Sequence, residues 1–424
     1  MTEERDGLSR RDFLKGSVVT AAALGIGSMG VFSSAEADAI GPNDMVNAAI
    51  IGTGSQGSYL LGRAIKVPNV KWVTACDIYA PNLKHGLSIA KGAAGCSDWK
   101  QVIEDKSIQA VIIATPITLH APMTIEALKA GKHVFCEKMM AYSIADAKRM
   151  GQTALQTGKK LQIGHQRSYD PTYQHAYKMI KDGVIGKVTH VRAQWNRNAS
   201  WRRPVPKDTT DQFINWRLYR KLSQGLMAEL GSHQISVVNW MVGQAPSAVM
   251  GSGGIDYWKD GREVYDNVQV IFEYPNGVRF TYQSLTTNQF DGATEQIMGD
   301  KGTVIISPGK AMLYKEPKAD ELVWESMAHK DTTGGKTGIV LDASKSPRVA
   351  KAAAEGTAIP GAAPEAKKDD YLLELEDFFV SIRDGHEPLC SPQVALDTCV
   401  PAIKANEAMD THKRIEIPAS MYKI

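Results

Sequence analysis

The chain has 424 residues, 43% of them hydrophobic, and a formal net charge of only +3, which argues against a strongly basic nucleic-acid-binding protein and leaves room for two globular domains. Its cysteines form no CxxC pair and no metal-finger spacing, so the sequence predicts no metal site of that kind. A disulfide between Cys390 and Cys399 is an alternative in an oxidising compartment, but free buried thiols are the preferred interpretation. The five cysteines are Cys76, Cys96, Cys136, Cys390 and Cys399.

The first 39 residues have the pattern of an export signal. Arg10 and Arg11 precede an uncharged segment, 16–34, and the small-x-small pattern Ala35-Glu36-Ala37 follows it. That segment is too short and too rich in Gly, Ser and Ala to span a bilayer, which takes roughly 20 strongly apolar residues. We therefore expect residues 1–39 to be a twin-arginine signal peptide and linker. The mature protein should reach the periplasm, or otherwise be exported, through the twin-arginine machinery, without a stable membrane anchor.

Buried strands and helices alternate over residues 45–165. Apolar runs of four or five residues joined by helical periodicity imply right-handed crossovers and a parallel sheet. This range is therefore expected to be an α/β, doubly wound domain that binds a dinucleotide. The expected strands are 48–51, 71–75, 110–114, 133–135 and 160–163, and the expected helices include 57–66, 122–130 and 143–157.

Residues 166–424 have a different pattern. β-branched and aromatic alternation over 187–196, 268–274 and 278–285, with a Tyr274-Pro275-Asn276-Gly277 turn, predicts an α+β domain with a mostly antiparallel sheet. Residues 318–370 are low in aromatics and rich in Ala, Lys, Gly and Pro, so we expect a surface excursion or an extended arm. Helices over 371–408 should pack back onto the domain.

A glycine-rich turn follows the first expected strand. Gly52, Gly54 and Gly57 are spaced as GxGxxG, which allows a tight turn, close approach of the backbone to a diphosphate, and close packing of helix on strand. Asp77 ends the next strand, 20 residues after Gly57, where a carboxylate binds both ribose hydroxyls and repels a 2′-phosphate. The pattern favours NAD over NADP. Ser55 and Gln56 complete the expected cofactor turn.

Two further expected strand ends carry polar residues. Thr115, Pro116 and His120 follow one strand, and Glu137 and Lys138 follow the next. Both ends should lie at the carboxyl edge of a parallel sheet, where ligands bind. A Glu-Lys pair at a strand end is commonly a solvated pair, but here Lys138 would point into the crevice beside a nicotinamide.

With these motifs in order, the chain resembles the Gfo/Idh/MocA oxidoreductases, in particular the glucose–fructose oxidoreductase-like members. The resemblance covers nearly all of the mature chain. It implies a Rossmann domain, a substrate and oligomerisation domain with a large open sheet, and hydride transfer between a nicotinamide and a sugar or polyol. The motifs that carry it are 52–57, Asp77, Thr115-Pro116 with His120, 131–138, 164–171 and 229–233.

The resemblance implies that Lys138 and His233 are catalytic. Two residues depart from the family pattern: Met139 stands in place of a proline, and Glu229 in place of an aspartate. Glu229 and His233 are four residues apart, on one face of a helix, where the carboxylate would raise the pKa of the imidazole and orient it as a general base. A surface ion pair is the alternative. A metal site would need a third ligand, and we predict none.

Three polar and aromatic clusters are candidates for substrate binding, because sugars are bound by flat aromatic faces and forked donors. Packing at a domain interface is the alternative for each residue. The candidates are His165, Arg167, Tyr169, Arg197, Trp201 and Trp216.

An export signal in front of a nucleotide-binding motif constrains the function. Free nucleotide is scarce outside the cytoplasm, so we expect tightly bound NAD that is recycled within the site while a carbohydrate is oxidised. One alternative is a redox-neutral glycosidase that oxidises a ring carbon transiently. A less favoured alternative is a non-catalytic sugar-binding protein. The open sheet is an expected contact surface of a homo-oligomer.

Overall fold

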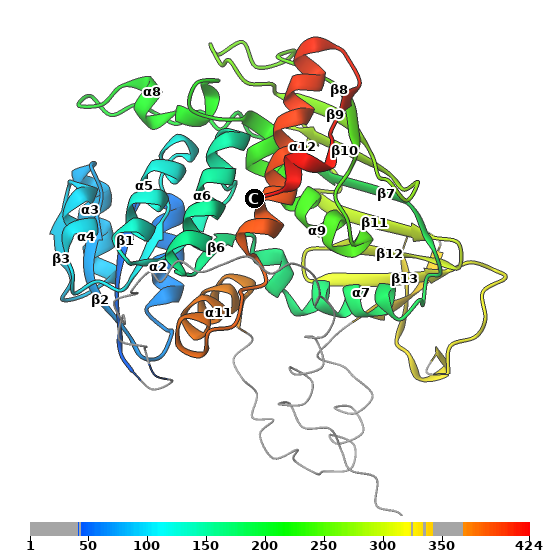
Figure 1. The fold of residues 1–424 in the computed structure, drawn as a ribbon. Coiled ribbons are helices and arrows are strands. Elements are labelled where there is room, and N and C mark those ends of the chain that lie inside the picture. The colour runs from blue at the N-terminus through cyan, green and yellow to red at the C-terminus, as the bar shows by residue number, and fades with distance from the viewer. Residues whose placement is uncertain (1–40, 42–43, 324, 334–335, 342–367) are drawn as a thin grey trace, which may run out of the picture. The chain divides into compact units, whose positions relative to one another are not determined.

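The chain divides into two units, residues 1–39 and 40–424. The computed structural model describes residues 41, 44–323, 325–333, 336–341 and 368–424 (Figure 1), so the expected signal peptide lies outside the described residues. Across the ranges that are described, no helix is long and apolar enough to cross a membrane.

A six-stranded parallel sheet confirms the expected dinucleotide-binding fold. Its strand order, β3-β2-β1-β4-β5-β6, is that of a doubly wound Rossmann domain. The strands are β1 (Val46–Ile51), β2 (Val70–Cys76), β3 (Ala94–Cys96), β4 (Ala110–Ile113), β5 (His133–Glu137) and β6 (Leu161–Gly164), and the helices between them are α2 (Ser55–Ala64), α3 (Ala80–Ile89), α4 (Trp99–Glu104), α5 (Ile117–Lys129) and α6 (Ile144–Thr157).

Alternate residues of these strands enter two cores. Ala49 and Ile51 of β1 pack with α5 and α6, whereas Ala48 and Ile50 pack with α2 on the opposite face. Helix α11 (Asp370–Asp384) also covers this second face, although it comes from the far end of the chain. Its Phe378 ring lies 5.9 Å from that of Phe135 in β5. A C-terminal helix therefore completes the N-terminal domain.

The second sheet has ten strands in the order β14-β15-β13-β12-β11-β7-β10-β9-β8-β16, and only the pair β7–β10 is parallel. This confirms the expected large, mostly antiparallel sheet. Gly277, at φ 90°, allows the tight turn between β9 and β10. The strands are β7 (Val188–Trp195), β8 (Ala248–Gly254), β9 (Asn267–Glu273), β10 (Arg279–Leu285), β11 (Ala293–Gly299), β12 (Gly302–Ser307), β13 (Lys310–Lys315), β14 (Lys330–Thr333), β15 (Lys336–Leu341) and β16 (Ile415–Glu416).

Part of the range expected to be a surface arm belongs to this sheet. Strands β14 and β15 pair with each other, and β15 pairs with β13 through Ala311 and Leu341. The alternation Ile339 and Leu341 buries two side chains within an otherwise polar stretch, which composition alone does not reveal. Residues 342–367 of the expected arm lie outside the described residues.

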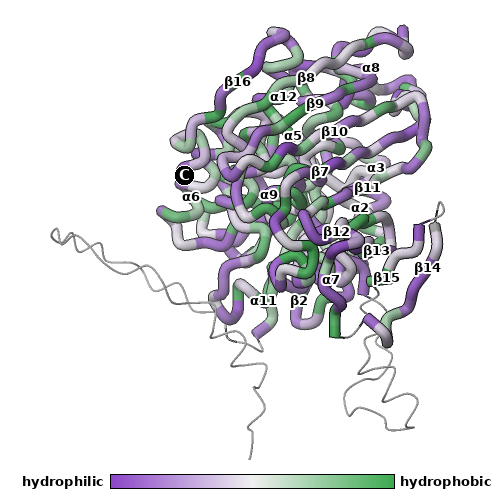
Figure 2. Tube along the Cα trace, turned by 90° about the vertical axis from the view of Figure 1, so that its right-hand side faces the viewer, coloured by the Kyte–Doolittle hydropathy of each residue, from purple (hydrophilic) through white to green (hydrophobic). Residues whose placement is uncertain are grey.

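Helices cover one face of the ten-stranded sheet. Figure 1 shows α7 (Pro171–Lys181), α9 (Ser232–Val242) and α12 (Pro392–Thr411) on this side. On the other face, residues of β7 to β11 line an open hollow of about 550 Å³. Figure 2, turned toward this side, shows strands β8, β9, β10, β7 and β11 running next to one another.

Candidate active site

The glycine-rich turn joins β1 to α2 and has the shape that a diphosphate requires. A Cβ on Gly57 would lie 1.8 Å from the carbonyl oxygen of Gly52, so the helix packs against the turn only with glycine there. A Cβ on Gly54 would meet only Asn82 Nδ2, at 3.5 Å, which leaves the turn open to a ligand. Helix α2 has no side-chain cap and no acidic residue in its first turn. Its free N–H groups fit the diphosphate of NAD.

Asp77 follows β2 directly and lies beside this turn. Its carboxylate accepts hydrogen bonds from the backbone N–H of Thr53 and of Tyr79, both at 2.8 Å. Two amides therefore fix the acid at the point where the ribose of a bound dinucleotide would lie. Its neighbour Ile78 has 77% of its surface exposed, which leaves an apolar side chain beside the acid.

Residues after β4 and β5 close the same edge of the sheet. Gln56 Nε2 donates to Glu137 Oε1 at 2.8 Å, which links the glycine turn to the end of β5. The ring nitrogens of His120 lie 2.9 Å from the carbonyl oxygens of Thr115 and Met139. Buried His120 thus connects the turns after β4 and β5 from the interior of the domain. Thr115 and Pro116, at the start of α5, lie at the carboxyl edge of the sheet.

Lys138 extends from this edge to the second domain. Its Nζ donates to the backbone carbonyl of Glu229 at 3.1 Å and lies 3.6 Å from the Glu229 carboxylate. Arg217 Nε contacts the same carboxylate at 2.9 Å. Burial alone would raise the pKa of Glu229, but the charges of Lys138 and Arg217 lower it to about 2. The peptide bond between Lys138 and Met139 is cis.

His233 lies in α9, just after a turn of π-helix, Met227–Gly231, that contains Glu229. Its ring is 5.3 Å from Trp195 and 6.0 Å from His165, and Nδ1 is buried without a hydrogen-bond partner. Burial, with the charges of Lys138 and Arg167, lowers the pKa of His233 well below its usual value.

This differs from the arrangement expected from the sequence, in which Glu229 orients His233 and raises its pKa. In the structure the Glu229 carboxylate contacts Arg217 and Lys138, and the pKa of His233 is lowered rather than raised. Spacing along a helix showed that the two residues are neighbours but gave no information on the cations that compete for the carboxylate. Among the described residues, the printed contacts of the Glu229 side chain are therefore with Arg217 and Lys138.

Tryptophans and arginines line the second side of the site. The guanidinium of Arg197 lies 5.0 Å from the ring of Trp195 and 5.7 Å from that of Trp201, and Arg217 lies 4.2 Å from the ring of Trp216. Within the described part of the chain, the Arg197 side chain has no ion pair and no hydrogen bond. Burial lowers its pKa. It is thus a partly buried cation whose donors are free.

Two of the expected substrate residues are occupied by partners inside the protein. Arg167 pairs with fully buried Glu295 and lies over Trp195, and the hydroxyl of Tyr169 donates to Asp377 of α11 at 2.6 Å. Both are placed to support the site rather than to face a ligand. His165 differs, because neither of its ring nitrogens has a partner and burial lowers its pKa to about 3.

Two residues of the site were absent from the expected set. Trp195 ends β7 and packs against both His233 and Arg197. Tyr282 in β10 is fully buried and packs against Gly231, in the π-turn that contains Glu229. Both occupy alternating positions of strands that are otherwise ordinary core, so the sequence pattern assigned them to packing.

The cysteines and acids of the described residues form no other reactive cluster. All five cysteines are free, and Cys390 and Cys399 contact different backbone carbonyls, those of His165 and Ala141. In the described ranges, no three His, Cys, Asp or Glu side chains are grouped to hold a metal ion.

Family models match both domains of this fold and the N-terminal segment. Residues 46–165 match the oxidoreductase family with an NAD-binding Rossmann fold, and residues 173–305 match the GFO/IDH/MocA C-terminal domain. The chain therefore belongs to the Gfo/Idh/MocA oxidoreductase family, as the resemblance implied. Residues 7–27 match the signal sequence of the twin-arginine translocation pathway, which directs export to the periplasm.

Relatives and solved structures agree with this assignment. Inositol 2-dehydrogenase of Salmonella typhimurium (strain LT2) is 28% identical over 88% of this chain and 98% of its own length. A scyllo-inositol 2-dehydrogenase (NAD(+)) of Bacillus subtilis is 26% identical over 62% of this chain and 73% of its own.

Among solved structures, levoglucosan dehydrogenase in complex with NADH has a TM-score of 0.72 and 18% identity, and covers 88% of this chain and 100% of its own. Aldose–aldose oxidoreductase from Caulobacter crescentus has a TM-score of 0.66 and 22% identity with the same coverage. These two likenesses concern the fold.

Proposed function

We propose that this exported protein holds NAD tightly and transfers hydride between that cofactor and a carbon of a sugar, a sugar acid or a polyol, with the cofactor recycled in the same site. One observation carries the proposal: Lys138, beside the cofactor turn at the carboxyl end of β5, bonds the backbone carbonyl of Glu229 at 3.1 Å, and Glu229 lies one helical turn before His233 in the second domain. When bound, NAD supplies the hydride acceptor and donor.

The residues around this point have complementary roles. His233 is neutral at ordinary pH because its pKa is lowered, so its imidazole is free to accept the proton of a substrate hydroxyl. Lys138 provides a fixed positive charge for the oxygen that loses this proton. Glu229 holds Lys138, and Trp195, Trp201 and Arg197 offer aromatic faces and free donors to a sugar ring.

The named relatives support the substrate class. They include inositol 2-dehydrogenases, and the solved neighbours include levoglucosan dehydrogenase and aldose–aldose oxidoreductase. The last of these pairs one aldose with another, which is the type of exchange that a cofactor recycled in place would serve. The export signal favours such an exchange, because cytoplasmic dehydrogenases cannot regenerate the cofactor there.

The proposal is tested on protein purified from its exported location without added nucleotide. Mass spectrometry should identify released NAD or NADH, and a reactive sugar should then change the absorbance of the bound cofactor at 340 nm once per chain. A second carbonyl sugar should reverse the change. Protein that is fully active yet arrives empty contradicts tight binding. Cleavage of a glycoside with no net change in cofactor indicates the glycosidase, and sugar binding with no absorbance change indicates a sensor.

A further inference from the structure

A long connection between β7 and the π-turn at Met227–Gly231 reaches from the ten-stranded sheet to the Rossmann domain. We call residues 196–224 the strap. It contains the short helix α8 (Asp211–Ile214) and the 3-10 turn Trp216–Leu218. Figure 1 shows α8 far out on the side of α3 and α5, away from the sheet from which the strap starts.

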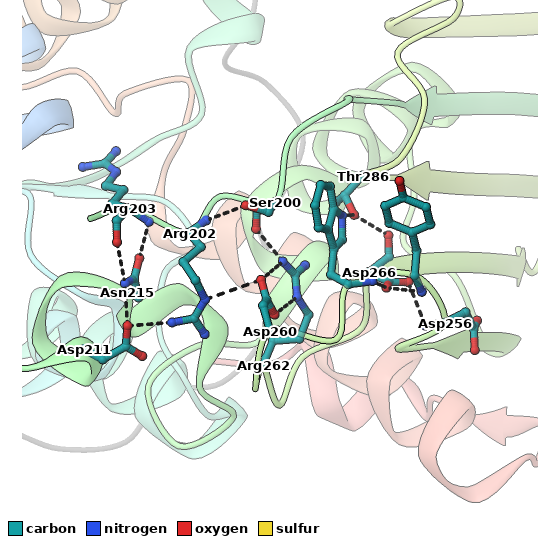
Figure 3. Close-up of polar contacts among 12 residues, drawn as sticks. Ser200, Arg202, Arg203, Asp211, Asn215, Asp256, Asp260, Arg262, Asp266 and Thr286 are labelled. Carbon is teal, nitrogen blue, oxygen red and sulfur yellow. Dashed lines mark hydrogen bonds and ion pairs between the residues drawn. The ribbon is translucent and has the colours of Figure 1, made fainter. Parts of the chain in front are cut away.

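An ionic network fixes the strap to the second domain (Figure 3). Arg202 contacts Asp211 at 2.6 Å and Asp260 at 3.4 Å. Arg262, whose side chain is 1% exposed, contacts Asp260 at 2.8 Å and donates to the carbonyl of Ser200 at 2.7 Å. Asp260 thus lies between Arg202 of the strap and the buried Arg262 of the domain. Because Arg202 also contacts Asp211, the network holds two parts of the strap to the domain.

The far part of the strap is braced internally and returns along the active site. Asn215 bonds the backbone of Arg203 in both directions, at 2.7 and 3.0 Å, which fixes the start of the strap against α8. Further on, Tyr142 donates to the carbonyl of Arg220, and Gln224 donates to the carbonyl of Tyr142, each at 2.8 Å. Arg217 of the strap contacts the same Glu229 carboxylate as Lys138, so the strap reaches the Lys138 end of the site.

The tip of the strap touches the opposite end of the cofactor site. The Phe213 ring packs on that of Tyr79 with centroids 5.9 Å apart, and Phe213 is still 44% exposed. The backbone N–H of Tyr79 bonds the Asp77 carboxylate, and Ile78 between them is 77% exposed. Apolar surface of this kind beside a ribose-binding acid matches the flat, apolar faces of adenine.

We propose that Phe213 and Tyr79 form the wall of the adenosine half of the NAD site, and that the strap closes over the cofactor from there to Tyr142. This inference rests on the proposed binding of NAD. It gives a physical reason why the protein would retain NAD tightly. Release of the nucleotide requires the Phe213–Tyr79 contact to separate while the Arg202 network holds the rest of the strap in place. The second domain thereby supplies a cofactor-binding residue, which the Rossmann motif does not include.

The test measures the rate at which the holoprotein releases NADH, from the loss of nucleotide fluorescence after mixing with excess NAD. Phe213→Ala should release NADH roughly fivefold to tenfold faster than the wild type, as expected from loss of one aromatic contact. Phe213→Trp should restore slow release. Arg202→Gln, which touches no nucleotide, should also accelerate release by loosening the strap.

Phe290→Ala is the matched control, since Phe290 is also an exposed phenylalanine, at 75%, but lies outside the strap. It should release NADH at the wild-type rate, and thermal melting should show that every variant is folded. Release from Phe213→Ala at the wild-type rate overturns the role of the strap but leaves the proposed function intact. Wild-type protein that binds neither NAD nor NADH overturns both.

Discussion

At the scale of single residues, the proposed role of His233 as general base leads to a direct test. It is 5% exposed, its Nδ1 has no partner, and no carboxylate competes for its ring within the described contacts. His233→Asn should lower kcat for sugar oxidation by about 10²- to 10⁴-fold, the usual contribution of a positioned base. The amount of bound NAD should not change, because the cofactor turn and Asp77 are unaffected. Steady-state kinetics and nucleotide content measure the two effects.

His190→Asn is the control for this substitution, because His190 is an exposed histidine of β7 whose Nδ1 contacts only Thr189. It should retain wild-type kcat. A His233→Asn enzyme with nearly normal kcat would exclude the imidazole as the base and leave Lys138 as the ionisable group beside the substrate.

Arg197 allows a prediction about substrate charge. Its guanidinium lies between Trp195 and Trp201 without an acid, whereas Arg217 and Lys138 share Glu229. A carboxylate on the substrate would complete a charge-assisted bond, so Arg197→Gln should lower kcat/KM for a sugar acid by roughly 10- to 100-fold. Kinetics on glucuronate and on glucose compare the acid with its neutral counterpart, for which the loss should be smaller. Arg203→Gln, an exposed neighbour, is the control. Equal losses on both sugars would argue for a general packing role.

At the scale of elements, helix α2 contains two glycines at which substitution by alanine should change the stability of the fold in opposite directions. A Cβ at Gly57 would overlap the Gly52 carbonyl oxygen, so Gly57→Ala should push the helix off the turn and destabilise the fold by about 1–3 kcal/mol or more. NAD binding should fall with it. A Cβ at Gly62 of the same helix meets nothing within 4 Å, so Gly62→Ala should stabilise by about 0.5–1 kcal/mol. Denaturant unfolding and nucleotide titration measure both variants, and equal behaviour would contradict the packing argument.

The end of α11 carries a pH-dependent contribution to stability. Burial would lower the pKa of His386, but its contacts with Asp384 and Asp377 outweigh burial and raise it. A histidine with a raised pKa stabilises the fold fully below about pH 6.5 and loses that contribution as the pH rises through the raised value. These three side chains are partly exposed, so the effect on stability should stay below about 1 kcal/mol. His386→Gln should reduce the change in melting temperature between pH 6 and 8. An unchanged pH dependence would exclude the contacts of His386 as the source of that dependence.

At the scale of the whole molecule, strand and helix periodicity was enough to predict the type of both sheets, although β3, β8, β11 and β13 were not among the expected strands. Runs such as Ala110–Ile113, buried on both faces, and the turn at Gly277 are local signals that tertiary packing did not override. Strands β14 and β15 were not predicted, because β14 is the polar edge strand and in β15 only Ile339 and Leu341 signal burial. Helix α11 was predicted as a helix, but its place on the Rossmann sheet depends on contacts such as Phe378 with Phe135 that lie far apart in the sequence.

The candidate site was predictable where backbone geometry dictates the residue. Gly57 and Asp77 follow from the turn and the strand end, whereas the partners of Arg167, Tyr169 and Glu229 depend on the tertiary fold. Buried Glu295 pairs with Arg167, although the sequence pattern predicted that Arg167 would bind substrate. Spacing therefore locates ionisable groups, and only the fold decides which of them remain free for a substrate.

The open face of the ten-stranded sheet leads to a last prediction. Its hollow of about 550 Å³ is lined by Gln, Thr and Arg side chains with apolar Met250 and Ile271, of which Ile271 is 40% exposed. We propose that a second copy of the chain covers this face, because a ten-stranded sheet with helices on one side leaves a broad surface suited to self-association. Ile271→Lys would place unpaired charges at the centre of such a contact and should convert the oligomer to monomers in sedimentation velocity. Val380→Lys, at a similarly exposed apolar residue of α11, should leave the oligomer intact, and a wild-type monomer at working concentration would contradict the proposal.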